Sequence, residues 1–228
     1  MNVWMAFLTL ELKYGSQNSL DNEMENACKQ NNPKQVYLRM CEILEKEVHS
    51  AIENGVNYTE AAEKANAMFL KMCKRFKSKK TAWLGHVKYL LKMGNSEEAS
   101  NVLKRSLLSL PVYKHIEMVS KVAELEFELG SPERGRTIFL ALLAKNPKRL
   151  DLLFVFIDKE IKSQNIDGAR ALFKSVNRPY PGSLKMKLND KQMKSLFKKW
   201  FRMEEVYGDL SSQNLVKQEA TSYVEGKK

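Results

Sequence analysis

Apolar side chains recur three and four positions apart along this chain, which is the spacing that gathers them on one face of an α-helix. Glycines, prolines and short polar stretches separate these segments, and no segment keeps the period-two alternation of a β-strand. The pattern predicts an all-α protein of six helical pairs, at residues 3–14 with 19–30, 35–53 with 58–77, 80–93 with 96–109, 114–129 with 132–145, 149–163 with 166–176 and 189–207 with 211–225.

The six pairs share one frame. The first helix of each pair ends at Gly15, Gly55, Gly94, Gly130, Gln164 or Gly208, and an apolar anchor stands eleven residues earlier, at Trp4, Leu44, Trp83, Val119, Leu153 or Phe197. Because glycine adopts left-handed backbone angles without strain, we expect it to close the helix and begin a tight turn. A repeat length of about 34 to 44 residues is typical of a solenoid of stacked helical hairpins.

Other positions of the frame predict how the helices pack. Apolar residues seven and eight before the first helix ends, such as Trp200 and Phe201, should face the core with the anchor. Small residues in the second helix should let the paired helices approach closely, at Ala99, Gly135 and Ala169. A large apolar residue follows each of them four positions later, at Leu103, Phe139 and Phe173. Prolines should then end the second helix, at Pro111, Pro147 and Pro181.

A glutamate stands four residues before the end of the first helix in four of the six pairs, at Glu11, Glu126, Glu160 and Glu204. Paired carboxylates could serve acid–base chemistry, but these belong to different repeats, about one solenoid step apart. We therefore expect each to bond a basic or backbone group of its own pair. The second pair lacks this glutamate and the third has Leu90 in its place.

The formal charge of +11 is concentrated in the middle of the chain. Residues 1–70 have a balance of −4, residues 71–199 of +16 and residues 200–228 of −1. A basic middle between near-neutral ends suits a surface that faces a polyanion, and a generic lysine-rich surface is the alternative.

Two basic clusters are the candidate sites for phosphate contact, which would be independent of base sequence and sensitive to salt. Lys191, Lys194 and Lys198 should form one stripe opposite Phe197, Trp200 and Phe201. The alternative is a solvated face, and in the first cluster also a favourable charge at a helix C-terminus. The clusters comprise Lys71, Lys74, Arg75, Lys77, Lys79 and Lys80, and then Lys185, Lys187, Lys191, Lys194, Lys198 and Lys199.

No set of residues in the sequence indicates catalysis, a cofactor or a metal site. His49, His86 and His115 are isolated, and His86 falls at a core position. Cys28, Cys41 and Cys73 are odd in number and scattered, which favours free thiols in a reducing compartment. No run of apolar residues is long enough to span a membrane.

The frame resembles half-a-TPR (HAT) repeats, most clearly at Ala169-Arg170-Ala171-Leu172-Phe173 and Gly135-Arg136-Thr137-Ile138-Phe139. HAT repeats occur in RNA-processing proteins. Residues 2–16, 119–149 and 151–162 are further similar to the C-terminal HAT region of the family of ribosomal RNA processing protein five, whose animal member is programmed cell death protein eleven. In that family, S1 RNA-binding domains precede the HAT region, and the protein works in nucleolar pre-ribosomes.

The resemblance implies a right-handed HAT solenoid that forms one domain, with repeats at about 1–32, 33–78, 79–111, 112–147, 148–181 and 182–228. Because the core pattern begins at Trp4 without a polar capping turn, we expect the chain to be part of a longer protein. The implied function is a non-enzymatic scaffold in small-subunit ribosomal RNA maturation, in the nucleolus of the nucleus. Pre-ribosomal proteins would be partners and pre-rRNA a candidate ligand, with no cofactor, small-molecule substrate or membrane. The rival is a HAT adaptor between proteins of splicing or mRNA 3′-end formation.

Overall fold

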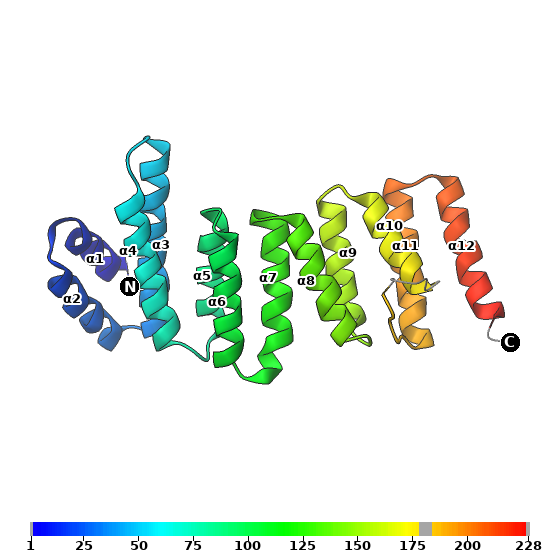
Figure 1. Ribbon diagram of the computed structural model, residues 1–228, viewed down its shortest axis with the longest axis horizontal. Helices are drawn as coiled ribbons and strands as arrows, with labels where there is room; N and C mark the ends of the chain where they lie inside the picture. The colour runs from blue at the N-terminus through cyan, green and yellow to red at the C-terminus, as the bar shows by residue number, and fades with distance from the viewer. Residues whose placement is uncertain (1, 178–183, 227–228) are drawn as a thin grey trace. The chain divides into compact units, whose positions relative to one another are not determined.

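A computed structural model describes residues 2–177 and 184–226 of the chain. The described residues form α-helices joined by short turns, with one 3₁₀ turn and no strand, which confirms the predicted all-α class (Figure 1). The chain divides into two compact units, Met1–Met118 (unit 1) and Val119–Lys228 (unit 2). Each unit is described by itself below.

Unit 1 contains six helices, the 3₁₀ turn and the first turn of a seventh helix. Neighbouring helices pack on each other in sequence, so that α1 packs on α2, α3 on α4, α4 on α5 and α5 on α6. Phe69 lies at the centre, stacked between the rings of His86 (5.4 Å) and Tyr89 (4.9 Å between centroids). The elements are α1 (Asn2–Tyr14), α2 (Gln17–Gln30), α3 (Pro33–Glu53), α4 (Thr59–Arg75), α5 (Lys80–Lys92), α6 (Ser96–Ser109) and η1 (Val112–Lys114).

Unit 2 contains most of α7 and the five helices that follow it. Its core repeats one contact, in which a phenylalanine from the second helix of one pair stacks on an aromatic ring in the first helix of the next pair. Phe139 stacks on Phe156 at 5.0 Å, and Phe173 stacks on Trp200 at 5.5 Å between ring centroids. The elements are α7 (His115–Leu129), α8 (Pro132–Lys145), α9 (Leu150–Lys162), α10 (Ile166–Asn177), α11 (Asp190–Tyr207) and α12 (Leu210–Glu225).

The predicted core stripe is buried at most of its positions. Among the anchors, Leu44, Trp83, Leu153 and Phe197 are buried, whereas Trp4 and Val119 are half-buried. The second helices also follow the prediction, since Ala99, Gly135 and Ala169 are buried. A Cβ added at Gly135 would lie 2.5 Å from the Phe127 ring of the preceding helix, so the small residue does allow close approach. The prolines follow the ends of α6 and α8 at Pro111 and Pro147, and Pro181 lies outside the described residues.

The expectation that the frame glycines adopt left-handed angles is correct for only some pairs. Gly55 and Gly94 have φ of 65° and 73°, and Gln164 adopts the same conformation at 60°. Gly15, Gly130 and Gly208 do not, and there the expectation is wrong. At Gly15 and Gly208 the space that a Cβ would need is filled by the carboxylate of the glutamate four residues earlier. Glycine is therefore required at those two positions for room and not for its backbone freedom.

The glutamates bond within their own pairs in part only. Glu126 accepts a hydrogen bond from the Ser131 backbone N–H (3.2 Å), as predicted. Glu11 also bonds within its own pair, but its donor is the Ser19 hydroxyl (2.7 Å), which is neither a basic nor a backbone group. The arginines that contact Glu160 and Glu204, however, come from the preceding pair. Arg136 of α8 donates to both Glu160 oxygens of α9 (2.7 and 3.0 Å).

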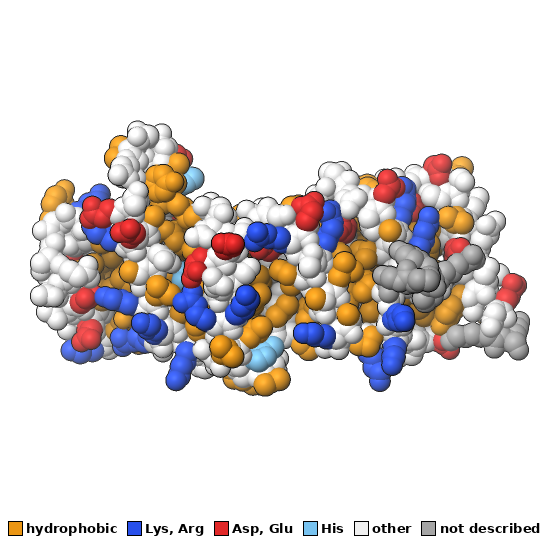
Figure 2. Space-filling model, in the orientation of Figure 1, with side chains coloured by type: hydrophobic (Ala, Val, Ile, Leu, Met, Phe, Trp, Pro, Cys, Tyr) orange, Lys and Arg blue, Asp and Glu red, His pale blue; other side chains and the backbone are white. Residues whose placement is uncertain are grey.

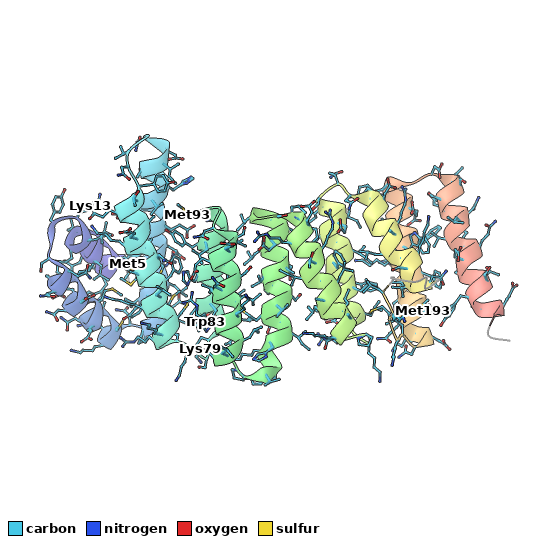
Figure 3. All side chains as sticks on the ribbon, in the orientation of Figure 1. Met5, Lys13, Lys79, Trp83, Met93 and Met193 are labelled. Carbon is cyan, nitrogen blue, oxygen red and sulfur yellow. The ribbon has the colours of Figure 1, made fainter. Side chains whose placement is uncertain are left out.

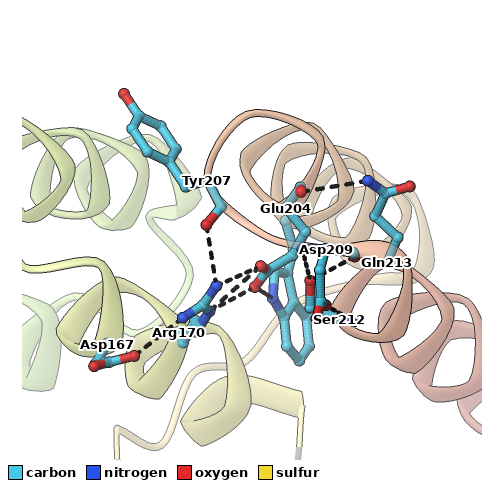
Figure 4. A network of polar contacts seen from close by, with 8 residues as sticks. Asp167, Arg170, Glu204, Tyr207, Asp209, Ser212 and Gln213 are labelled. Atoms are coloured by element: carbon cyan, nitrogen blue, oxygen red, sulfur yellow. Dashed lines mark hydrogen bonds and ion pairs between the residues drawn. The ribbon is translucent and has the colours of Figure 1, made fainter.

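The second of these contacts, between Arg170 of α10 and Glu204 of α11, is drawn in Figure 4. The guanidinium donates to the carboxylate from Nε at 3.0 Å and from Nη2 at 2.9 Å, and the Trp200 indole N–H donates to it at 3.2 Å. Glu160 and Glu204 are each only 2% exposed. We call these two ion pairs the repeat clamps, because each joins one helical pair to the next within unit 2.

Candidate nucleic-acid interface

The first basic cluster lies where α4 ends and α5 begins. The backbone of this turn is held by two hydrogen bonds, from the Phe76 N–H to the Met72 carbonyl (2.9 Å) and from the Lys79 N–H to the Phe76 carbonyl (2.8 Å). The Trp83 indole N–H then donates to the Lys77 carbonyl at 2.8 Å. Figure 3 shows Trp83 and Lys79 near this end of α5. The buried anchor of the third pair therefore fixes the turn that presents the lysines.

Three of the six predicted residues of this cluster are engaged inside unit 1. Lys71 forms an ion pair with Asp21 (3.0 Å), and Lys80 forms one with Glu117. The Arg75 guanidinium lies 5.3 Å from the centre of the Tyr37 ring and donates to the Tyr37 hydroxyl at 3.3 Å. This hydrogen bond raises the pKa of Arg75 above its ordinary value, so the group stays charged.

The other three residues, Lys74, Lys77 and Lys79, are exposed, and no acidic group pairs with them in the part of the chain that the structure describes. Lys114 of η1 joins them, because its ammonium donates to the Ser78 carbonyl at 3.0 Å. We define Lys74, Lys77, Lys79, Lys114 and Tyr113 as the turn cluster. On the face seen in Figure 2, Lys and Arg side chains gather along the lower edge of unit 1.

Tyr113 supplies the turn cluster with an aromatic ring. Its side chain is 78% exposed, and the Lys114 ammonium lies 5.5 Å from the ring centre. The sequence prediction missed Lys114 and Tyr113 because they lie over thirty residues from the other lysines. The sequence feature that could have identified Tyr113 and Lys114 is their position two and three residues after Pro111, the proline that follows α6. The arrangement offers cations for phosphates and a ring face on which a base can stack.

The second basic cluster lies on α11 and on the segment before it in unit 2. Lys185 and Lys187 precede the helix and are exposed. The Lys187 backbone N–H donates to the Pro147 carbonyl at 2.7 Å, which ties this segment to the turn between α8 and α9. Asn189 then caps α11 reciprocally with Gln192, at 2.9 and 3.0 Å.

Lys191, Lys194 and Lys198 form the predicted stripe on the exposed side of α11. Arg202 extends the stripe by one turn. The sequence prediction did not include it, although its spacing of four residues from Lys198 places it on the same face of the helix. Lys199 is not part of the stripe, because it pairs with Asp158 of α9 (2.7 Å) and lies 4.9 Å from the centre of the Phe154 ring.

Phe201 departs from its predicted place. The sequence puts it with Phe197 and Trp200 on the core side, but its ring is half-buried and lines a surface groove together with Lys194 and Lys198. The helix angle is not the reason, because Val87 and Ile157 stand at the same offset in other pairs and are buried. In the last pair, α12 leaves one edge of the Phe201 ring uncovered at the groove.

His86 and the three cysteines are buried in the packing of unit 1. His86 is buried, and its Nε2 lies 2.8 Å from the Asn66 side-chain oxygen. Burial lowers the pKa of His86 to about 4, so the ring is neutral at pH 7. Cys28, Cys41 and Cys73 are buried free thiols, and burial raises the pKa of Cys73 to about 12.

Among the described residues, no group of three or more His, Cys, Asp or Glu side chains is placed to hold a metal ion. None of the described helices has the length and apolar character needed to cross a membrane. The segment from Asn177 to Asn189, which joins the fifth and sixth pairs, falls partly outside the described residues.

The whole chain is similar to proteins named for ribosomal RNA biogenesis. It is 38% identical over 224 residues to rRNA biogenesis protein rrp5 of Schizosaccharomyces pombe, and 34% identical over 227 residues to the protein RRP5 homolog of Mus musculus. An rRNA biogenesis protein RRP5 of Arabidopsis thaliana is 34% identical over 225 residues. These matches cover 98% to 100% of the chain but only 11% to 12% of each relative. No protein-family model matches the chain.

Proposed function

We propose that this chain is the HAT-repeat region of an RRP5-type protein and acts as a non-enzymatic scaffold in ribosomal RNA maturation. The observation that carries the proposal is similarity over the whole chain to a fungal and a plant protein whose names specify rRNA biogenesis, and to an animal protein named as an RRP5 homolog. The small-subunit pathway, the nucleolar location and the pre-ribosomal protein partners follow from the family resemblance.

The architecture that we propose is a right-handed solenoid of six antiparallel hairpins. The consecutive packing of helices within each unit supports it. So does the recurrence of the same ring stacking and the same repeat clamp at successive pairs of unit 2. In such a fold each repeat contacts its neighbours, and the stack offers an extended surface to partners.

Within this scaffold the turn cluster is the proposed contact for pre-rRNA. Its lysines are free of acidic partners, so binding phosphate would not require an internal ion pair to break. The Trp83 hydrogen bond holds the turn in place, which reduces the entropy lost on binding. Tyr113 adds an exposed ring, and stacking of a base on such a ring contributes about 1–3 kcal/mol.

Fluorescence anisotropy with a labelled single-stranded RNA, at a series of salt concentrations, tests this contact. Lys77→Ala/Lys79→Ala should weaken binding and lower the magnitude of the slope of log affinity against log salt by about 1.4, because two phosphates of a single strand would no longer be neutralised by a lysine. Lys13→Ala/Lys46→Ala removes the same charge from exposed lysines elsewhere in unit 1 and is the matched control. An equal drop in affinity for both variants would contradict a specific contact at the turn cluster.

The stripe on α11 is the second proposed RNA contact. Replacing Lys191, Lys194 and Lys198 by Glu should weaken RNA binding without unfolding the chain, because all three side chains are exposed. Circular-dichroism melting gives the control. A melt like that of the parent together with unchanged RNA affinity would remove the stripe as an RNA site.

A further inference from the structure

A surface groove of about 900 Å³ runs between α11 and α12 in unit 2. Its floor is apolar and comes from both helices. Phe197 and Phe201 of α11 face Val216, Ala220 and Val224 of α12 across it. Val216, Ala220 and Val224 are four residues apart, so they follow one another along a single face of α12.

The two helices close the floor only in part. Phe197 and Val216 are buried, but Val224 is 59% exposed and Phe201 is half-buried. Tyr223 closes one end, since its ring lies 5.8 Å from that of Phe197 and its hydroxyl donates to Asp190 at 3.1 Å. An apolar strip therefore remains accessible beside a closed end.

The rim of the groove is basic. Lys194, Lys198 and Arg202 stand on successive turns of α11, and Lys217 of α12 lies 5.3 Å from the centre of the Phe201 ring. The acidic lining residues are Asp190, which already accepts the Tyr223 hydrogen bond, and Glu205. Four cations thus face two carboxylates around an apolar floor.

We propose that this groove binds an amphipathic α-helix with acidic flanks, presented by a partner protein. From Lys194 to Glu205 the groove spans about 16 Å, which is three turns of a helix. A helix of that length places apolar side chains at i, i+4 and i+7 on such a floor, and its flanking carboxylates meet the basic rim. The inference rests on the proposed scaffold role for the existence of a protein partner.

Phosphate contact at the rim lysines, as proposed above for the stripe on α11, leaves the apolar floor unoccupied. Two other occupants fit that floor less well than an amphipathic helix does. RNA bases need an exposed ring face, but Phe197 is buried, Phe201 is half-buried, and Val216, Ala220 and Val224 are aliphatic. A second copy of this chain that paired through the same groove would bring one basic rim against another. The acidic helix is the occupant that satisfies both the floor and the rim.

The test is binding of a designed, fluorescein-labelled helical peptide of about 15 residues to the full chain. The peptide carries Leu at i, i+4 and i+7 with Glu on both flanks, and a second peptide replaces each Glu by Lys. We expect saturable binding of the acidic peptide that weakens as salt rises, and binding of the Lys peptide that is about tenfold weaker or more.

Val224→Asp should weaken binding of the acidic peptide about tenfold or more, because it removes an apolar contact and adds repulsion. Leu215→Asp is the matched control on the same helix, since Leu215 is 40% exposed and does not line the groove. Lys198→Glu/Lys217→Glu should abolish the preference for the acidic peptide. Both groove variants should melt like the parent.

Three results would overturn the proposal: equal affinity for both peptides, equal effects of Val224→Asp and Leu215→Asp, or no binding of the acidic peptide. Self-association that Val224→Asp abolishes, seen by analytical ultracentrifugation, would make a second copy the occupant and also overturn it. Loss of RNA binding in Lys77→Ala/Lys79→Ala with peptide binding intact would separate this groove from the turn cluster. Recovery of pre-ribosomal proteins with the parent chain but no peptide binding would leave the scaffold role standing and refute the groove alone.

Discussion

Replacing Arg170 by Met tests whether the repeat clamps hold unit 2 together. The guanidinium makes two short bonds to a carboxylate that is 2% exposed. Breaking a buried pair from one side typically costs about 3–5 kcal/mol, because a charge is left without compensation. The Trp200 N–H remains as a donor to Glu204, and the Arg170 side chain is 28% exposed, so we expect about 3 kcal/mol.

The ion pair between Arg149 and Asp151 provides the control. Its bonds of 2.8 and 2.7 Å have the same bidentate geometry, but its side chains are 45% and 63% exposed. Solvent screens such a pair, so Arg149→Met should cost less than about 1 kcal/mol. The assay is urea unfolding followed by the fluorescence of Trp200, with Trp4 and Trp83 replaced by Phe in every variant so that only unit 2 is reported.

The pH dependence of the clamp has a defined sign. Burial acts to raise the pKa of Glu204, but hydrogen bonds from Arg170, Trp200 and Ser212 outweigh it and hold that pKa below 4.5. The stabilisation is therefore complete above pH 4.5 and is lost as the pH falls through the lower native value. The cost of Arg170→Met should shrink in acid over that range.

A double-mutant cycle with Glu204→Gln isolates the interaction. In the Arg170→Met background, Glu204→Gln removes a buried charge that has lost its arginine and keeps only neutral donors such as the Trp200 N–H, so we expect a coupling energy of about 2–3 kcal/mol. A coupling below about 0.5 kcal/mol, or an equal cost for Arg170→Met and Arg149→Met at pH 7, would refute the reasoning.

Three further substitutions follow from the packing. Gly208→Ala should lower the melting temperature and weaken the clamp, since the new Cβ would overlap the Glu204 carboxylate; an unchanged melt would contradict this. Trp83→Ala should cost about 3–5 kcal/mol in urea unfolding and release the Lys77 carbonyl, which increased amide exchange in the α4–α5 turn would report. With the pKa of His86 lowered to about 4, stability should fall by up to about 3 kcal/mol between pH 6.5 and pH 4, and replacement of His86 by Gln should flatten that dependence of the urea midpoint.

The helices were predictable from the sequence because periodicity and helix-ending residues are local signals. The predicted fourth and fifth pairs, for example, agree with α7 to α10 to within one residue at each end. Only part of the stacking of Phe139 and Phe173 could be predicted from the sequence. The repeat frame predicted that both side chains are large and buried, but it did not predict which helix they would contact.

The departures come from long-range geometry. Nothing near Glu204 in the sequence shows that its arginine stands 34 residues earlier, in the preceding pair. The same holds for Lys114, which reaches the turn cluster from 36 residues away. Phe201 shares an offset with buried residues of other pairs, yet α12 leaves its edge uncovered. The clustering of lysines in the sequence therefore located the basic regions. Only the structure showed which of these cations pair with an acidic or aromatic side chain and which are exposed without such a partner.

Affinity purification of the tagged endogenous protein after ultraviolet crosslinking tests the central claim most directly. Sequencing of the bound RNA and mass spectrometry of the bound proteins should recover pre-rRNA with early small-subunit assembly factors. Substitution of the turn cluster should reduce the RNA crosslinks and leave the protein partners. Recovery of spliceosomal or polyadenylation factors without pre-rRNA would contradict the account and support the rival adaptor of mRNA processing.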